Sequence, residues 1–420
     1  MNSIKLPSLA FHCFRCFPLR MLSLPSKRLM PEINEDDDDD VMLAACAIAV
    51  EKRRQHQQLV RVFIQAAEDV FAAYKKYRGG DNAVLNFELP PEGFETFHFE
   101  TYCDKLFVQD FRFNKVQVTV IVQSLVTHAG LPEEVVSYAQ DKAPLRTAFL
   151  MLCMKYAWPT RLGRMTQMFG KSISWISRIV TTMRTLLFTF CHGKMRCPPQ
   201  LGAADLANFT RAVQAISGLD VCFGFLDATV RPICRPSIGQ KECYSGKDRL
   251  HAIKFQICST PDGIIQHIDG PWPGRRHDHH MVNSAPLSTG TPALTSWILG
   301  HPPTVYGTNH IVYADAGYYT QPGIESPWPD GAFNAAHQTQ NDMMKSSRIA
   351  VEWEFGHVLE HWASLHFRPS QKLLQAGIGQ AYIVAAFLTN IHNIVHPSKT
   401  SIYFHVAPPS LEAYLRRLKS

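Results

Sequence analysis

Apolar residues recur every three to four positions through the first half of the chain, and this spacing predicts helices. The clearest runs occupy residues 50–77, 101–107, 115–129 and 143–156. They are separated by short polar stretches that contain Gly, Asn and Pro, which are typical of turns. We therefore expect a helical N-terminal region over residues 46–142.

A helical hairpin is predicted over residues 160–190. Its first helix ends at Gly170, and Ser172 or Ser174 is suited to cap the second helix. The inner face of the second helix is formed by Ile176, Ile179, Met183 and Leu187. A short glycine-containing turn between two helices is typical of the DNA-binding helix-turn-helix. A helical hairpin inside a protein core has the same apolar spacing, so both interpretations stay open on the pattern alone.

The pattern changes after Pro198-Pro199, where short β-branched and aromatic runs predict strands. These runs lie at 221–230, 252–259, 263–269 and 304–315. The turn sequence Pro261-Asp262-Gly263 joins two of them into a hairpin. Long helices are predicted next, at 341–361 and 372–395, so we expect an α/β domain over residues 205–397.

The longest uncharged stretch is residues 373–398. It contains Gln, Asn and His side chains throughout, which favours a buried amphipathic helix over a membrane span. We expect no association with a membrane.

The overall composition is that of a globular protein, with 46% hydrophobic and 19% charged residues. It excludes a largely disordered chain, a collagen-like fibre and a coiled coil. The net charge of +6 is mild, but residues 142–196 carry ten basic residues and no acid. A segment charged this one-sidedly predicts a polyanionic partner.

The charge pattern also sets domain limits. Residues 1–31 hold bases without acids and residues 32–40 hold acids without bases, so residues 1–45 are predicted to be a disordered tail. The expected order after the tail is a helical region, a helix-turn-helix domain over 143–197, the α/β domain over 205–397 and a C-terminal tail over 398–420. Residues 1–30 also loosely resemble an organelle-targeting segment.

Four acids stand at strand ends, in a loop or on a helix of the α/β domain: Asp227, Asp278, Asp315 and Glu352. A carboxylate at the end of an apolar strand must be solvated, paired or bound to metal, because burying it alone is costly. Carboxylates from two strand ends and a helix form an oxygen-only site suited to Mg²⁺ or Mn²⁺. Two such ions can promote phosphoryl transfer.

The motifs around these acids, taken together, resemble a known family. They are Gly224-Phe225-Leu226-Asp227-Ala228-Thr229, Tyr244-Ser245-Gly246-Lys247-Asp248-Arg249, Gly274-Arg275-Arg276-His277-Asp278, Asp315-Ala316-Gly317-Tyr318 and Arg348-Ile349-Ala350-Val351-Glu352 with Phe355-Gly356. In this order they resemble the DDE endonuclease domain of Harbinger-type transposases and their domesticated nuclease relatives.

The resemblance implies an RNase H-like α/β core, preceded by an all-α helix-turn-helix domain, that cuts DNA with two Mg²⁺ or Mn²⁺ ions. By motif, Asp227, Asp315 and Glu352 carry over as catalytic acids and metal ligands. Asp278 carries over as an accessory ligand or a rival second acid. Two departures are Ala228, where the family usually has Gly, and Asp248 inside a basic motif.

Supporting residues follow from spacing and from the motifs. Arg348 lies one helical turn before Glu352 and is suited to orient it, and His277 precedes Asp278. Glu354 lies about 200° around the helix from Glu352, so the two cannot face the same metal. The candidate DNA-binding residues are Arg161, Arg164, Lys171, Ser174, Ser177, Arg178, Arg249 and Lys254.

Three functions are weighed from these observations. The first is a transposase-like DNA endonuclease, and the second is a DNA-binding regulator that has lost nuclease activity. The third is an unrelated hydrolase of small phosphates, which the basic segment disfavours. The resemblance further implies DNA as the partner, a separate Myb-like DNA-binding protein, a homo-oligomer and a nuclear location.

Overall fold

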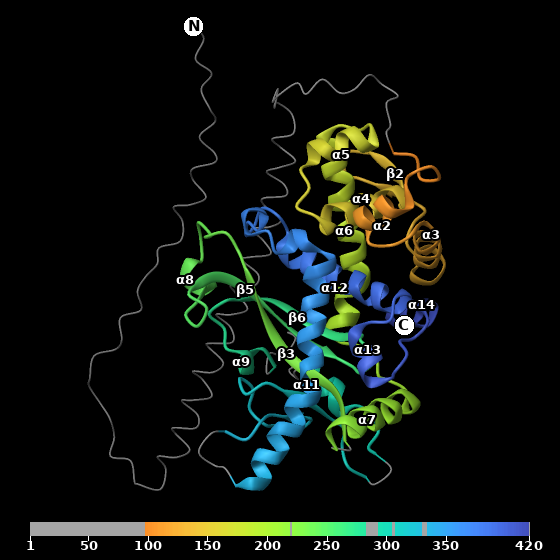
Figure 1. The fold of residues 1–420 in the computed structure, drawn as a ribbon. Coiled ribbons are helices and arrows are strands. Elements are labelled where there is room, and N and C mark those ends of the chain that lie inside the picture. The colour runs from red at the N-terminus through yellow and green to blue at the C-terminus, as the bar shows by residue number, and fades with distance from the viewer. Residues whose placement is uncertain (1–96, 219–220, 283–292, 305–306, 330–333, 420) are drawn as a thin grey trace, which may run out of the picture. The chain divides into compact units, whose positions relative to one another are not determined.

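The computed structural model describes residues 97–218, 221–282, 293–304, 307–329 and 334–419. All of them belong to one compact unit, Ala67–Ser420 (Figure 1). The predicted tail over 1–45, the targeting segment and the helix over 50–77 lie outside the described residues.

The first described elements form a helical region. They are α2 (Asp104–Phe111), α3 (Lys115–Ser124), the π-helical turn η2 (Leu125–Ala129), α4 (Leu145–Ala157), α5 (Leu162–Phe169) and α6 (Ile173–Arg196). Strands β1 (Glu134–Val136) and β2 (Lys142–Pro144) pair antiparallel within it. The expectation of an all-α region therefore misses one short strand pair, whose three-residue strands are too short to produce a periodic pattern.

The helix ends in this region have clear local causes. The side chain of Asn114 accepts from the N–H of Gln117, and the side chain of Gln117 accepts from the N–H of Asn114, so α3 begins with a capping box. Helix α5 ends at Gly170, whose φ of 61° suits glycine. The hydroxyl of Ser172 accepts from the N–H of Trp175 and starts α6. The turn of the hairpin predicted from sequence lies where expected, but α6 continues six residues beyond the predicted end at 190.

The second part of the chain builds a mixed sheet. Its elements are α7 (Ala203–Ser217), β3 (Cys222–Pro232), α8 (Gln240–Cys243), β4 (Tyr244–Ser245), β5 (Leu250–Ser259), β6 (Ile265–Pro273), α9 (Asp278–Val282), α10 (Ala293–Leu299), β7 (Ile311–Ala314) and β8 (Ile324–Glu325). The spatial order is β6-β5-β3-β7-β8, and β4 pairs with the start of β5.

Strand direction changes at the centre of this sheet. Strand β5 runs antiparallel to both β3 and β6, whereas β7 runs parallel to β3 and β8 parallel to β7. Three antiparallel strands followed by two parallel ones are consistent with an RNase H-like core. Strand β7 ends beside the middle of β3, where Ala314 pairs with Leu226. Asp227 therefore lies inside β3 and not at a strand end as expected, next to Asp315, which directly follows β7.

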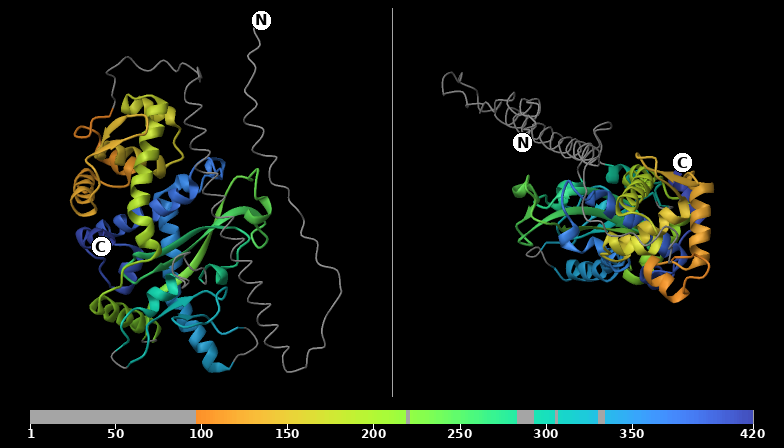
Figure 2. Two further views of the ribbon diagram at one scale, coloured as in Figure 1. Left: turned by 180° about the vertical axis from the view of Figure 1, so that it is seen from behind. Right: turned by 90° about the horizontal axis from the view of Figure 1, so that it is seen from above.

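The remaining helices pack on the sheet and on the helical region. They are α11 (Ala335–His361), the 3₁₀ turns η3 (Ala363–Leu365) and η4 (Arg368–Ser370), α12 (Ile378–Val395), α13 (Lys399–Phe404) and α14 (Leu411–Lys419). Helix α11 packs on β3, β5 and β7, and α6 and α12 pack on β6 (Figures 1 and 2). Helix α6 therefore runs from the helical region to the sheet.

Helix α12 is long and apolar enough to cross a membrane by length and composition, but 78% of it is buried inside the protein. It packs against α6, α11 and β6, which matches the prediction of a core helix. The cysteines among the described residues are free thiols.

Three boundaries differ clearly from the predictions. The strand expected over 304–315 is only Ile311–Ala314, because Thr304 bonds the backbone of Gly307 and Thr308 and does not pair with a neighbouring strand. Helix α11 begins six residues earlier than predicted because Asn334 caps it. Helix α12 begins later because Leu374 and Gly377 have positive φ angles.

The C-terminal residues are not a detached tail. Helices α13 and α14 occupy much of the segment predicted as 398–420, and Leu411, Tyr414 and Leu415 of α14 are buried against α6, α3 and η2. The apolar positions of α14 follow a helical period, but the run is only nine residues long. Its short length and high charge hide it in the sequence.

Candidate active site

Asp227 lies within β3, in register with Ile257 of β5. Its side chain is 17% exposed, and its Oδ1 accepts a 2.7 Å hydrogen bond from the N–H of Ala228. Burial raises the pKa of Asp227 to about 6, although that N–H and the charge of Arg348 act in the opposite direction. A carboxyl buried this far needs a cation beside it to stay ionised.

Asp315 and Glu352 lie beside Asp227 but come from other elements. Asp315 directly follows β7, and because Leu226 pairs with Ala314, Asp227 and Asp315 are the next residues on two adjacent parallel strands. Glu352 lies on α11, which packs on both strands. The side chains of Asp315 and Glu352 are 42% and 54% exposed, so this acidic group opens to solvent on one side.

Arg348 connects the three acids. One guanidinium nitrogen, Nη1, lies 3.4 Å from Oδ2 of Asp227, and the other, Nη2, lies 3.5 Å from Oδ1 of Asp315 and 3.2 Å from Oε1 of Glu352. The sequence predicts the contact with Glu352 from the i, i+4 spacing. The contacts with Asp227 and Asp315 join residues more than thirty positions apart and have no local signal.

The donor set fits a hard divalent cation in its chemistry, because all three groups are carboxylates facing one positive charge. As placed, however, no group of three or more His, Cys, Asp or Glu side chains in the described part of the chain has the spacing to hold a metal ion. The guanidinium of Arg348 lies at the point on which the acids converge. A metal at this point requires Arg348 to move aside.

Asp278 lies next to this group but has a different partner. It is the first residue of α9, and its Oδ1 accepts from Nζ of Lys254 on β5 at 2.9 Å. Its other oxygen packs on the turn after Asp315, where a Cβ added to Gly317 would lie only 3.2 Å away. Asp278 and Asp315 are therefore neighbours, and the charge of Asp278 is balanced by Lys254 and not by Arg348.

Tyr318 was not singled out from the sequence. It follows Asp315 in a turn closed by its N–H bonding the carbonyl of Asp315 at 2.9 Å. Its ring is buried and its hydroxyl makes no hydrogen bond within the described residues. Burial, and then the charges of Asp278, Asp227 and Asp315, raise the pKa of Tyr318 well above its usual range. The sequence signal that marks it is its place at the end of the motif Asp315-Ala316-Gly317-Tyr318.

Ala228 and Asp248, the two residues that depart from the family's usual motifs, have clear local roles in the structure. Ala228 supplies the N–H that bonds Asp227, so the backbone function of this position does not depend on glycine. Asp248 accepts from the hydroxyl of Ser245 at 2.6 Å, which keeps its carboxylate within its own turn. His277 is exposed and contacts the ring of His280, away from the three acids.

The candidate DNA-binding residues divide into two sets. Five side chains on or beside α5 and α6 are exposed: Arg161, Arg164, Lys171, Ser174 and Ser177. Arg178 is instead half-buried, and it pairs through two nitrogens with Asp141, which lies outside the acid-free segment. The prediction that Arg178 presents its charge to a ligand therefore misses a tertiary partner.

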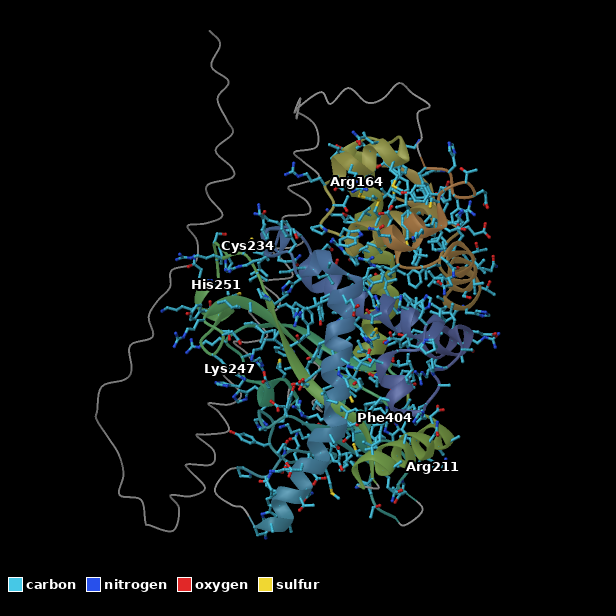
Figure 3. The ribbon with its side chains drawn as sticks, viewed as in Figure 1. Arg164, Arg211, Cys234, Lys247, His251 and Phe404 are labelled. Carbon is cyan, nitrogen blue, oxygen red and sulfur yellow. The ribbon has the colours of Figure 1, made fainter. Side chains whose placement is uncertain are left out.

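The basic candidates of the sheet also differ from each other. Lys254 pairs with Asp278 and is half-buried, so it is not an open phosphate contact. Arg249 is exposed just before the start of β5. Its neighbour Lys247 is exposed and His251 is half-buried (Figure 3). Figure 3 also shows Arg164 on α5.

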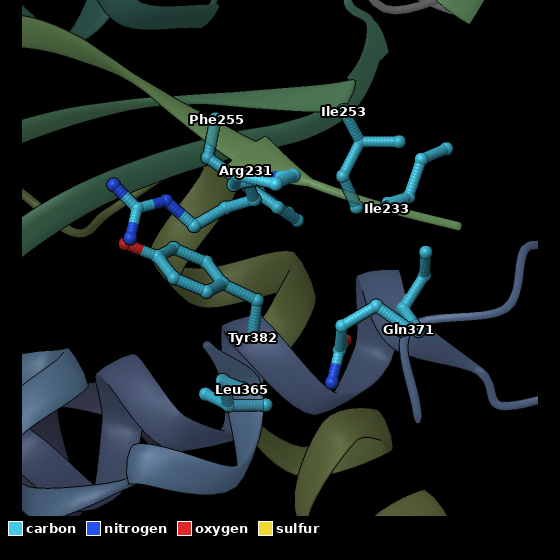
Figure 4. Close-up of a pocket in the computed structure, with 9 residues that line it drawn as sticks. Arg231, Ile233, Ile253, Phe255, Leu365, Gln371 and Tyr382 are labelled. Carbon is cyan, nitrogen blue, oxygen red and sulfur yellow. The ribbon is translucent and has the colours of Figure 1, made fainter. Parts of the chain in front are cut away.

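The described residues offer little room for a small enclosed ligand. A hollow lined by residues that include Arg231, Phe255, Gln371 and Tyr382 has a volume of about 10 Å³ (Figure 4). This volume is about that of one water molecule, and a second hollow beside Arg196 and Asp269 is no larger. Neither hollow is lined by the three acids, two of which are instead open to solvent.

Residues 226–390 match the family described as DDE superfamily endonuclease. This part of the chain is a DDE endonuclease domain. The matched residues include Asp227, Asp278, Asp315 and Glu352. The match implies a transposase-derived nuclease. Comparisons with curated proteins and with solved structures gave no match.

Proposed function

We propose that this chain is a metal-dependent DNA endonuclease of transposase type, related to the Harbinger family. The observation that carries the proposal is that Asp227, Asp315 and Glu352, from three separate elements of the DDE endonuclease domain, converge on one cationic group. Carboxylates so arranged hold cations strongly and are open to solvent on one side. This is the arrangement that cutting a large polyanion requires.

The three acids are proposed to hold two Mg²⁺ or Mn²⁺ ions, with Asp278 as an accessory ligand. When bound, such ions supply Lewis-acid stabilisation of the charge that develops at phosphorus. The chain's own part is positional. Asp227 is fixed by the N–H of Ala228, Asp278 by Lys254, and Glu352 by its place on α11, so three of the four carboxylates start from supported positions.

The exposed basic and hydroxyl residues of α5 and α6 are proposed to bind the DNA. Arg161, Arg164 and Lys171 would contact phosphates, and Ser174 and Ser177 lie at the start of α6, where a recognition helix meets the major groove. Because α6 continues as one helix to the catalytic sheet, DNA bound at its start has a defined position relative to the acids.

The test is DNA cleavage by the purified full-length chain with Mg²⁺ or Mn²⁺. We expect cleavage that requires the metal and is lost in Asp227→Asn, Asp315→Asn and Glu352→Gln. Asp278→Asn tests whether Asp278 is an accessory ligand or the second catalytic acid. If Asp278 is an accessory ligand, this variant should keep reduced cleavage activity. Cleavage that persists in Asp315→Asn but is lost in Asp278→Asn would reverse the assignment of the second acid.

A catalytically silent DNA-binding regulator is the second candidate. The pairing of Arg348 with all three acids favours it, because a permanently bound guanidinium would exclude metal from the site. Retained DNA binding without cleavage under any divalent ion would support this candidate. Nuclear location, a homo-oligomer and a separate Myb-like DNA-binding partner remain part of either proposal.

A further inference from the structure

We propose that Arg348 is a displaceable substitute for the divalent ions. In the metal-free protein its guanidinium offsets part of the negative charge of Asp227, Asp315 and Glu352. It withdraws when metal binds, so that it opposes metal binding. The inference rests on the proposed function, because it concerns the same three acids.

The contact distances indicate a guanidinium that is shared and not fixed to one partner. The three N–O distances are 3.2, 3.4 and 3.5 Å, all longer than the roughly 2.7–2.9 Å of a charge-assisted hydrogen bond. By contrast, Arg196 lies 2.8 Å from Asp269, and Arg178 contacts Asp141 through two nitrogens. Arg348 is thus held by the summed field of three charges, which a divalent ion placed among them can replace.

The net charge of the site also favours the binding of a cation. One guanidinium against three carboxylates leaves the group with an excess of negative charge. Two of the acids are more than two-fifths exposed, so a hydrated ion can approach them from solvent. Arginine does not lose its proton at accessible pH, so its positive charge stays. The guanidinium must therefore move away before a metal ion can bind between the acids.

Movement of Arg348 is sterically simple. Its side chain projects from the middle of α11, whose backbone is fixed by the packing of Ala350, Val351 and Phe355 in the core. Only the flexible arginine side chain needs to change rotamer, and the helix that carries Glu352 stays in place. The metal-bound site can therefore form without a change of fold.

A purely structural ion pair makes the opposite prediction. If Arg348 only held the acids in place, its removal would let them separate and would weaken metal binding. If Arg348 competes with metal, its removal strengthens metal binding, because the ion no longer displaces a positive charge at about 3.5 Å from each ligand. The sign of the effect decides between the two roles.

The experiment is titration of the full-length chain with Mn²⁺ in the absence of DNA, with free Mn²⁺ measured by electron paramagnetic resonance. We expect Arg348→Gln to bind Mn²⁺ at least tenfold more tightly than the unmodified chain. Arg348→Lys, which keeps the charge but loses the forked geometry, should lie between them. Asp227→Asn added to Arg348→Gln should remove the gain.

Arg416→Gln is the matched control, because Arg416 forms an i, i+4 pair with Glu412 on α14, at 2.6 Å, as Arg348 does with Glu352 on α11. It should leave Mn²⁺ affinity unchanged. Circular dichroism of each variant reports folding, and Arg348→Lys keeps the test valid if Arg348→Gln is unfolded.

Equal or weaker Mn²⁺ binding in the Arg348 variants, with binding still lost in Asp227→Asn, would overturn this inference and leave the proposed metal site standing. Mn²⁺ binding that no substitution of the three acids reduces would overturn both. Tighter binding in Arg348→Gln that depends on Asp227 supports both.

Discussion

Two glutamates on α11, only two residues apart, have opposite surroundings. Glu352 is more than half exposed and faces Arg348. Glu354 is buried, where its Oε2 accepts from Nδ2 of Asn393 at 2.8 Å and its Oε1 accepts from the hydroxyl of Thr400 at 2.6 Å. The first is placed for chemistry, and the second joins α11 to α12 and α13.

Substitution of these two glutamates should separate function from stability. Glu354→Ala leaves two buried donors without a partner, so we expect the free energy of unfolding to fall by about 3 kcal/mol. Glu352→Ala should change it by less than about 1 kcal/mol while abolishing metal-dependent cleavage. Urea unfolding and a cleavage assay measure both. A large stability loss in Glu352→Ala would contradict the assignment.

A second buried carboxyl gives the protein a pH dependence away from the site. Asp262, in the turn between β5 and β6, accepts from the hydroxyl of Thr260 at 2.5 Å and from the N–H of Ile264 at 3.2 Å. Burial nevertheless raises the pKa of Asp262 to about 6. Because its folded pKa lies above its unfolded value, the folded state binds more protons between pH 4 and 6, and stability falls as the pH rises through that window.

Asp262→Asn removes this titration but keeps an oxygen that accepts the same two hydrogen bonds. We expect the variant to gain about 2 kcal/mol relative to the unmodified chain as the pH rises from 4 to 7. Unfolding by urea at several pH values measures the difference. A difference that does not change with pH would show that Asp262 titrates normally.

At the residue scale, sequence reasoning identified the acids but not most of their partners. The spacing of Arg348 and Glu352 on one helix predicts their contact, and the helical angle predicts that Glu354 faces elsewhere. The contact of Lys254 with Asp278 and that of Arg178 with Asp141 join different elements. Such pairs depend on how the elements pack, which a single sequence does not encode in any local pattern.

Among the elements, α6 links the proposed DNA-binding hairpin to the catalytic sheet. Its 24 residues span about 36 Å as one helix. Near its C-terminal end Arg196 pairs with the buried Asp269 of β6 at 2.8 Å. This ion pair fixes the end of the helix against the sheet.

Loss of this ion pair should weaken the link. Arg196→Met leaves Asp269 buried without its arginine, so we expect the free energy of unfolding to fall by about 3 kcal/mol. Lys142→Met is the control, because Lys142 pairs with Glu134 at 3.6 Å on the surface and should cost less than about 1 kcal/mol. Chemical unfolding of both variants measures this. Equal losses would contradict the anchoring role.

Several elements with strong local signals were predicted, but the 15-residue helix α7 was not. The hairpin of β5 and β6 follows from alternation and from the turn at Gly263, whose N–H bonds the carbonyl of Thr260. Helices α5 and α6 follow from their apolar stripes and the glycine between them. Strand β8 and the pair β1–β2 have two or three residues each and were missed, because they exist through pairing with neighbours and not through their own pattern.

At the scale of the whole molecule, the positive charge of the segment over 142–196 is balanced in part by acids from elsewhere in the chain. Acids from outside the segment pair with three of its ten bases: Asp141 with Arg178, Glu134 with Lys142 and Asp269 with Arg196. Other bases bond carbonyls, as Arg184 does with Ala376. Besides Lys142, the exposed bases of the segment are Arg146, Arg161, Arg164 and Lys171, and these carry the charge proposed to contact DNA.

This distribution predicts how DNA binding depends on salt. Arg164→Gln should reduce the slope of log affinity against log salt concentration by about one, because one phosphate contact is lost. Arg178→Gln should leave the slope nearly unchanged, because its charge is already balanced by Asp141. Fluorescence anisotropy of a labelled duplex at increasing salt measures both. Equal slope changes would contradict the division of the basic residues.

The central claim is that Asp227, Asp315 and Glu352 form one divalent-metal site. Cleavage of the protein chain by bound Fe²⁺ with ascorbate and peroxide tests it most directly, because the radicals formed cut the backbone only near the ion. We predict cuts close to these three residues, suppressed by excess Mg²⁺ and absent in Asp227→Asn. Cuts confined to other parts of the chain, or unchanged in Asp227→Asn, would contradict the account.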